Sequence, residues 1–164
     1  MKNTFPYFVR GKVVKGFGRG SKSLGIPTAN YEQSVVDQLP DTLNKGIYYG
    51  FAQVEQSPVH ECCLSIGWNP YFGNQVKSME THIIHNFSDD FYGSILKVCL
   101  IGYIRDEMNF TSIDELKSAI HRDIQFTKEE LSKPEVSKLS RHPFFTDSSN
   151  SNGVHDGTNG KTDL

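Results

Sequence analysis

The sequence lacks a long apolar run, a strong excess of one charge and any abundance of cysteine. No stretch of apolar residues approaches the roughly 18 that a membrane-spanning helix needs, and the N-terminal segment has no apolar signal-peptide core. Lysine and arginine number 17 against 19 aspartates and glutamates, so the formal net charge is −2. This balance counts against a general nucleic-acid or membrane surface, and we expect neither as a partner.

The three cysteines, Cys62, Cys63 and Cys99, are an odd number, and their spacing matches no metal site or disulfide framework. Each lies in an apolar stretch, which favours buried free thiols. Free thiols are typical of a reducing compartment. Since no targeting segment is apparent either, the sequence predicts a cytoplasmic protein.

Five segments in the first two thirds of the chain have the β-branched and aromatic composition of strands. They are residues 7–16, 46–55, 60–68, 78–87 and 94–105. Gly50, inside the second segment, is expected to mark a bulge or kink. The turns between the segments carry proline, glycine, asparagine and aspartate and leave no room for crossover helices, which favours antiparallel pairing. The pattern therefore predicts a closed or nearly closed antiparallel barrel.

One helix is expected after the strands, over about residues 112–132. Ser112 and Glu115 form a capping box at its start, and Pro134 lies beyond its end. Apolar residues at helical spacing form one stripe that is expected to lie against the sheet. The stripe consists of Ile113, Leu116, Ala119, Ile120 and Ile124.

The length of 164 residues is that of a single domain with its own core. From Thr146 onward the sequence becomes polar and rich in glycine, which is typical of a flexible tail. We therefore expect one domain over residues 1–145, including the helix, followed by a polar, flexible tail over residues 146–164.

A glycine-rich loop, GFGRGSKSLGIPTAN at residues 16–30, looks like a phosphate-binding loop but fits none of the common patterns. Ser21 separates Gly20 from Lys22, which excludes the Walker pattern, and Pro27 stands where the dinucleotide fingerprint needs a helix. Successive glycine N–H groups can still turn inward around an anion, and Lys22 can add a positive charge. The alternative is a flexible hairpin whose glycines serve only the turn.

Two short patterns after this loop suggest metal ligands and a base. Thr28 and Asn30 are two residues apart, so their side chains share one face of an extended segment and offer hard oxygen ligands to Mg²⁺. Glu80 lies in the middle of a predicted strand, where a carboxylate that faces a ligand is a candidate base for a substrate hydroxyl. Each pattern has an ordinary alternative: a turn or cap for the Thr–Asn pair, and a solvent-facing strand acid for Glu80.

Taken together, six segments resemble the monofunctional, eukaryotic-type riboflavin kinases. They read GKVVKGFGRGSKSLGIPTAN, GIYYGFA, SIGWNPYF, SMETHII, DDFYG and GYIRDEMNF, and the resemblance spans roughly residues 6–131. It implies a mainly β fold, a six-stranded antiparallel Greek-key barrel with a C-terminal helix packed on it. It also implies transfer of the γ-phosphoryl group of ATP to the 5′-hydroxyl of riboflavin, giving FMN and ADP. No segment is present for the adenylyltransferase domain of bacterial relatives, so we do not expect synthesis of FAD.

The resemblance also implies roles for individual residues. Glu80 corresponds to the catalytic base, and Thr28 and Asn30 hold a divalent metal, with Mg²⁺ expected and Zn²⁺ or Mn²⁺ left open. The glycine-rich loop arches as a flap over the phosphates of ATP. The residues expected to bind ATP are Gly16, Lys22, Thr28, Ile83, His85 and Tyr92. Those expected on the flavin side are Arg105, Met108 and Phe110.

Two other functions fit a barrel of this kind. A non-catalytic flavin- or nucleotide-binding barrel would keep the fold without the chemistry, but Glu80, the Thr–Asn pair and Lys22 are present together. An oligonucleotide-binding barrel has a similar strand count, but the acidic net charge and the lack of a basic stripe count against it. We expect a monomer, since a closed barrel leaves no free strand edge to pair.

Overall fold

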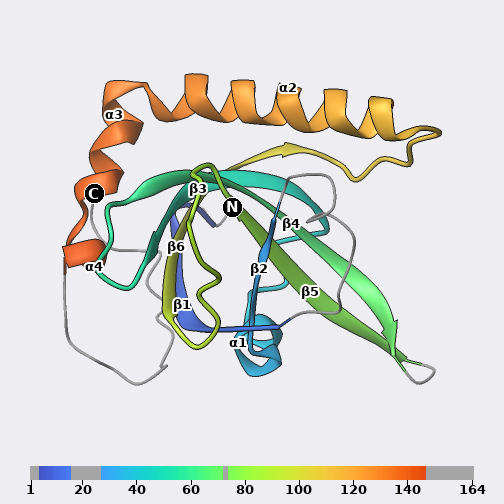
Figure 1. The fold of residues 1–164 in the computed structure, drawn as a ribbon, viewed down its shortest axis with the longest axis horizontal. Helices are drawn as coiled ribbons and strands as arrows, with labels where there is room; N and C mark the ends of the chain where they lie inside the picture. The colour runs from blue at the N-terminus through green and yellow to red at the C-terminus, as the bar shows by residue number, and fades with distance from the viewer. Residues whose placement is uncertain (1–3, 16–26, 72–73, 147–164) are drawn as a thin grey trace.

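Six antiparallel strands close into a barrel in the order β1-β2-β5-β4-β3-β6 (Figure 1). The computed structural model describes residues 4–15, 27–71 and 74–146 of the chain. Gly16, Lys22 and most of the expected tail therefore lie outside the described residues. The strands are β1 (Tyr7–Val14), β2 (Ala29–Tyr31), β3 (Gly46–Val54), β4 (His60–Tyr71), β5 (Asn74–Ile83) and β6 (Ile95–Arg105).

The order of the strands is that of a Greek key. Strands β3, β4 and β5 pair with one another in sequence order, and β2 lies beside β5 instead of beside β3. Every pair in the barrel is antiparallel. The expected six-stranded barrel with a C-terminal helix is confirmed.

Alternate residues of the strands fill the barrel interior, as the two-residue period of a strand requires. Helix α1 (Gln33–Asp37) closes the lower end of the barrel in Figure 1 and adds Val35 and Val36 to the same core. Full burial of an aliphatic side chain of this size contributes about 1.5–3 kcal/mol to stability. Among the core residues are Val9, Val13, Leu64, Ile66, Met79, Ile83, Leu96, Val98 and Leu100. Since side chains pack the interior, polar residues with a chemical role belong on the outer face.

The pairing of β3 with β6 is irregular beside Gly50, where the sequence predicts a bulge or kink, and the extra residue is Ile101 of β6. The pairing of β3 with β6 shifts its register between Tyr49 and Gly50. A side chain at Gly50 would collide with the carbonyl oxygen of Cys99 on the neighbouring strand. Only glycine permits this close approach of the two backbones, so the irregularity expected beside Gly50 is confirmed, although the extra residue belongs to the neighbouring strand.

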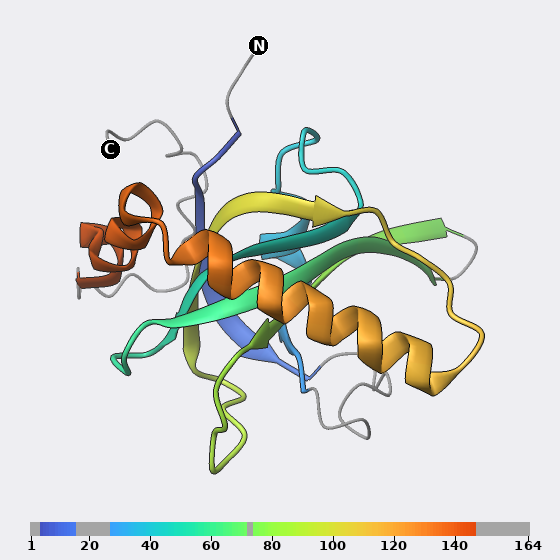
Figure 2. The ribbon, with the colours of Figure 1, turned by 90° about the horizontal axis from the view of Figure 1, so that it is seen from above.

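Helix α2 (Ile113–Leu131) crosses the outer face of β4 and β3 (Figure 1, Figure 2). The side chain of Ser112 accepts a hydrogen bond from the N–H of Glu115 at 3.1 Å, so the predicted N-cap is confirmed. The predicted apolar stripe is wrong in part, because Ile113 is 58% exposed. The residues that α2 buries are Ala119, Asp123, Thr127 and Leu131. Two polar side chains can lie in this stripe because the barrel supplies partners for both.

Three short helical elements follow α2 and cover a second apolar cluster on the outside of the barrel. They are α3 (Pro134–Ser137), the 3₁₀ helix η2 (Lys138–Arg141) and α4 (Pro143–Thr146). Phe8 of β1 contacts the Phe144 ring at 5.0 Å between centroids, and Lys97 Nζ donates to the Phe144 carbonyl oxygen at 3.0 Å. Elements of four residues carry no detectable periodicity, so the sequence pattern does not predict them.

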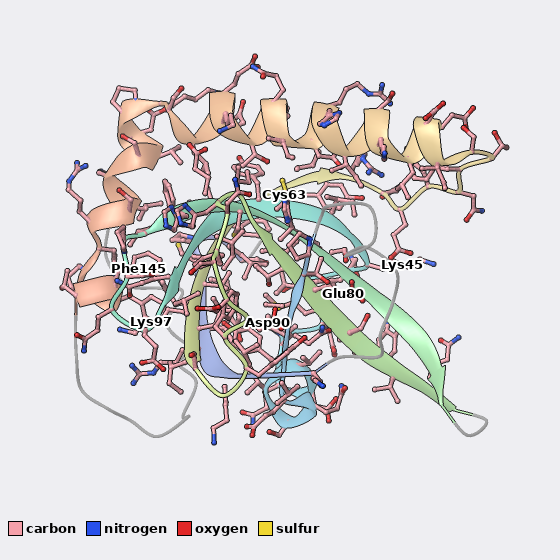
Figure 3. The ribbon with its side chains drawn as sticks, in the orientation of Figure 1. Lys45, Cys63, Glu80, Asp90, Lys97 and Phe145 are labelled. Carbon is pink, nitrogen blue, oxygen red and sulfur yellow. The ribbon has the colours of Figure 1, made fainter. Side chains whose placement is uncertain are left out.

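The three cysteines are free and buried, as expected. Cys62 belongs to the barrel interior and Cys99 to the outer apolar cluster. The Cys63 Sγ lies 3.1 Å from Thr127 Oγ1, which joins β4 to α2 (Figure 3). Burial raises the pKa of Cys63 to about 11, so this thiol stays protonated at neutral pH.

Candidate active site

The register of the closed barrel aligns outward-facing residues of five strands in one row. Arg105 pairs with Ile47, Ile47 with Ser65, Ser65 with Glu80, and Glu80 with Asn30. Residues directly opposite each other in an antiparallel pair point to the same face. All five are partly buried. The row thus places a carboxylate, an amide and a guanidinium along one side of the barrel.

Three residues predicted to share a site do lie together. Thr28 Oγ1 donates a hydrogen bond to Glu80 Oε1 at 3.3 Å, and Asn30 is the register partner of Glu80. Met79 and Thr81, on either side of Glu80, point into the barrel and are 1% exposed each. Because strand residues alternate, the Glu80 carboxylate points outward, beside β2 (Figure 3). Glu80 is therefore held between two paired strands on a half-buried face.

Tyr92 lies at the β1 side of this cluster. The N–H of Gly93 donates to the carbonyl oxygen of Val13 at 2.8 Å, which ties the segment before β6 to β1. Lys15 Nζ is 5.7 Å from the centroid of the Tyr92 ring, which is half-exposed. Val14 of β1 pairs with Asn30 of β2. Lys15, which follows Val14, and the Tyr92 ring that it contacts therefore lie next to β2, where the glycine-rich loop begins.

Ile83 and His85, both predicted to border ATP, occupy different environments. Ile83 is 4% exposed and belongs to the barrel core, so its side chain faces the interior. His85 is exposed and stacks on His60, with ring centroids 4.0 Å apart and planes 19° apart. Phe87 packs its edge against both imidazoles, at 4.7 Å from His85 and 6.1 Å from His60. Sequence reasoning did not predict this contact between His60 and His85.

Arg105, Met108 and Phe110, predicted on the flavin side, follow one another from the end of β6 to the start of α2. Arg105 forms a bidentate ion pair with Asp123 of α2. The hydrogen bond with Asp123 raises the pKa of Arg105, so the guanidinium stays charged. Met108 is 52% exposed and Phe110 is partly buried. This segment therefore presents an apolar side chain and a fixed cation at the same end of the row.

Glu107 is a further residue that sequence reasoning missed. A Cβ added at Gly67 would lie 2.7 Å from Glu107 Oε2, and Ser78 Oγ is within 3.8 Å of the same point. The Glu107 side chain therefore reaches over Gly67 of β4. Nothing in the local pattern of Glu107 marks it, because its position depends on how the whole segment folds back over the barrel.

The chain matches a known protein family over most of its length. The family described as flavokinase, riboflavin kinase, matches residues 3–131. The chain belongs to the riboflavin kinase family. The riboflavin kinase of Mus musculus is 56% identical over 142 residues, which cover 87% of this chain and 92% of the relative. That of Homo sapiens is 56% identical over 140 residues, covering 85% of this chain and 90% of the relative.

The fold agrees with a solved structure of the same family. The crystal structure of riboflavin kinase from Trypanosoma brucei matches with a TM-score of 0.74 at 32% identity, covering 92% of this chain and 96% of that one. The predictions of a riboflavin kinase family member and of an enzyme that transfers a phosphoryl group are thereby confirmed. Within the described residues, every helix is too short or too polar to span a membrane.

Riboflavin kinases use ATP and require a divalent metal, and the donors beside Glu80 are of a suitable kind. A threonine hydroxyl, an asparagine amide oxygen and a carboxylate are hard ligands, which suit a small divalent cation bound together with phosphates and water. Among the described residues, no three His, Cys, Asp or Glu side chains gather closely enough to hold a metal alone. A metal at Thr28 and Asn30 therefore needs further ligands from the substrate.

The stacked imidazoles predict an acid-sensitive stability. Burial, and to a smaller extent the neighbouring His85, lower the pKa of His60 below its usual value of 6.5. The unfolded chain then binds the proton more readily than the folded one, so the free energy of unfolding falls as the pH drops below 6.5. His60→Phe keeps a stacking ring but cannot titrate, so it should lose less stability between about pH 7 and pH 5 than the wild type.

Urea denaturation followed by circular dichroism at several pH values measures this difference. The control is His121→Gln, which removes an exposed histidine of α2 and should parallel the wild type. An equal loss of stability on acidification in His60→Phe and in the wild type would contradict the assignment to His60.

Proposed function

We propose that this chain transfers the γ-phosphoryl group of ATP to the 5′-hydroxyl of riboflavin, with FMN and ADP as products. The observation that carries the proposal is the cluster of Thr28, Asn30 and Glu80 on one half-buried face of a riboflavin kinase barrel. Phosphoryl transfer depends on positioning and on neutralising charge more than on covalent chemistry of the protein. The paired strands β2 and β5 hold Asn30 and Glu80, and Thr28 directly precedes β2, which suits that requirement.

Glu80 is the proposed catalytic base. Glu80 pairs with Asn30 of β2 on one side and with Ser65 of β4 on the other, so its backbone is held in place from both sides. A carboxylate within hydrogen-bond reach of the 5′-hydroxyl orients that group and takes its proton as the bond to phosphorus forms. Thr28 donates to Oε1, which keeps the carboxylate turned toward β2, where we place the phosphates.

Thr28 and Asn30 are the proposed protein ligands of the metal, which we take to be Mg²⁺, with Zn²⁺ or Mn²⁺ as alternatives. When bound, the ion neutralises negative charge on the transferred phosphate. Both side chains are neutral, so the phosphates of ATP and water supply the remaining ligands. Ligands of this kind favour a metal that arrives and leaves with the nucleotide over one that stays in the protein.

ATP is proposed to lie over β1 and β2, with the glycine-rich segment as a flap. The described ends of that segment, Lys15 and Pro27, lead out of β1 and into β2. The Pro27 carbonyl oxygen lies 2.9 Å from His82 Nδ1 on β5, which fixes the second end beside Glu80. Gly16 and Lys22 of the proposed flap lie outside the described residues. Tyr92 and His85 are proposed to border the same nucleotide.

Riboflavin is proposed to lie between the barrel and α2, at the Arg105 end of the row. Met108 and Ile113 are large apolar side chains with more than half of their surface exposed, at 52% and 58%. A planar isoalloxazine ring packed on this segment would cover such surface, and Arg105 would donate to its polar edge. Phe110 flanks the ring, and the ribityl chain then extends along the row toward Glu80.

The remaining predictions on organisation are not tested. A single domain over residues 1–145 with a flexible tail over residues 146–164, a monomeric state and a cytoplasmic location stay predictions. A non-catalytic flavin-binding barrel is the second candidate function, and the first experiment below separates it from the kinase.

The first expected result is FMN formation by the purified full chain. Riboflavin, ATP and MgCl₂ are incubated with the protein, and flavins are separated by chromatography with fluorescence detection. FMN should appear only when all components are present, because the metal and ATP act together. Unchanged riboflavin under Mg²⁺, Mn²⁺ and Zn²⁺, with riboflavin binding retained, would instead support the non-catalytic barrel.

Glu80→Gln should lower kcat by about 100-fold or more, since a positioned general base contributes roughly 10²–10⁴-fold. Glutamine keeps the shape of the side chain and an acceptor for Thr28, so riboflavin affinity should change by no more than a few-fold. The control is Glu135→Gln, at an exposed site on α3. Wild-type turnover in Glu80→Gln would remove Glu80 from the mechanism.

Asn30→Ala should raise the Mg²⁺ concentration that gives half-maximal rate, by about 10-fold, which is the usual size for a lost charge-assisted ligand contact. The measurement is the initial rate of FMN formation against free Mg²⁺ at saturating ATP and riboflavin. Gln125→Ala, which removes an exposed amide of α2, serves as the control. A metal dependence in Asn30→Ala equal to that of the wild type would refute the ligand assignment.

A further inference from the structure

Helix α2 buries a carboxylate where a surface helix normally buries an apolar side chain. Its buried residues, Ala119, Asp123, Thr127 and Leu131, are spaced four apart and therefore lie in one stripe. The Asp123 side chain is 8% exposed. Aspartate is almost never buried to this extent unless it is paired, so the position calls for a specific partner.

Arg105 is that partner. Its Nε donates to Asp123 Oδ1 at 2.9 Å, and its Nη2 donates to Oδ2 at 2.8 Å. This two-point contact fixes the plane of the guanidinium as well as its distance. Arg105 Nη1 also donates to the carbonyl oxygen of Asp106 at 3.0 Å. Of the five N–H groups of the guanidinium, three are thus used within the described residues, and two remain for a ligand.

The part of α2 that carries Asp123 is attached to β4 by side-chain contacts. One turn further along α2, Thr127 Oγ1 contacts Cys63 Sγ of β4 at 3.1 Å, in a fully buried pair. Lys128 reaches Glu61 of the same strand at 3.5 Å. The helix segment that carries Asp123 is therefore docked on β4, the strand whose Ser65 stands between Arg105 and Glu80 in the outward-facing row.

We propose that Asp123 is a positioning residue for flavin binding, which holds the Arg105 guanidinium in place before riboflavin arrives. This inference rests on the proposed role of Arg105 on the flavin side. A free arginine side chain has many rotamers, and ordering it on binding weakens affinity. An arginine already fixed by Asp123 loses little freedom, so its two remaining N–H groups meet the flavin without that cost.

A purely structural clamp between α2 and β6 is the competing interpretation. Loss of such a clamp lowers the folded fraction or the stability, and it changes the binding of riboflavin and ATP alike. Loss of a positioning contact acts on riboflavin alone, because ATP is proposed to lie at the other end of the row. The two interpretations therefore differ in which affinity changes.

The decisive variant is Asp123→Asn in the full chain, with Glu129→Gln as the matched control on the exposed side of α2. Riboflavin affinity is measured by quenching of flavin fluorescence, and KM values by FMN formation. Asp123→Asn should weaken riboflavin binding by about 10-fold, as expected for the loss of one hydrogen bond between charged groups. The KM for ATP should stay within about twofold and kcat at saturating riboflavin within about threefold.

Asp123→Glu serves if the asparagine variant does not fold. It keeps the charge and hence the buried pair, but the longer side chain shifts the guanidinium, so riboflavin affinity should fall while the melting temperature stays near that of the wild type. Wild-type riboflavin affinity in both variants would overturn the inference, as would equal losses of riboflavin and ATP affinity.

A double-mutant cycle separates this inference from the proposed function. Asp123→Asn should cause no further loss of riboflavin affinity when Arg105→Ala is already present, because the residue through which Asp123 acts is gone. A full additional loss in that background would overturn the positioning role alone. Equal riboflavin affinity in the wild type and in Arg105→Ala would refute the flavin role of Arg105 and the inference with it. Failure of the wild type to form FMN, with this binding pattern intact, would contradict only the kinase chemistry.

Discussion

The register of the closed barrel is the constraint on which the rest of the structure depends. Strand residues alternate between interior and surface, so a shift of one residue in β5 would exchange Glu80 with its neighbours Met79 and Thr81. The apolar interior opposes that shift, because it would expose Met79 and bury a carboxylate without a partner. The core thus specifies which side chains form the outward-facing row, although none of the row belongs to the core.

The closed form of the barrel also explains why the candidate site lies on its outer face. The described residues fill the interior mainly with apolar side chains, and the outer face of a small barrel is open to water unless another element covers it. Helix α2 covers β4 and β3, and the Glu107 side chain reaches over Gly67. The place proposed for riboflavin, between the barrel and α2, therefore depends on an element that contributes little to the barrel core.

How far sequence predicts this structure depends on how local each signal is. Long strands, the irregular pairing beside Gly50 and the cap at Ser112 follow from alternation, glycine and capping chemistry, and all three are confirmed. Strand β2 has only three residues and α1 only five, so neither carries a period, and only the family resemblance implied a sixth strand. The grouping of Thr28 and Glu80 depends on pairing between β2 and β5, which no local pattern encodes.

The stripe of α2 shows why the remaining part of the site escaped prediction. Helical periodicity identifies a face by its apolar residues, and here it pointed to Ile113, which is exposed. The buried face includes Asp123 because Arg105 at the end of β6 neutralises it, and that partner is remote in sequence. A buried ion pair of this kind adds little net stability over an apolar pair. Its presence in a packed helix interface is consistent with the positioning role that we propose for Asp123.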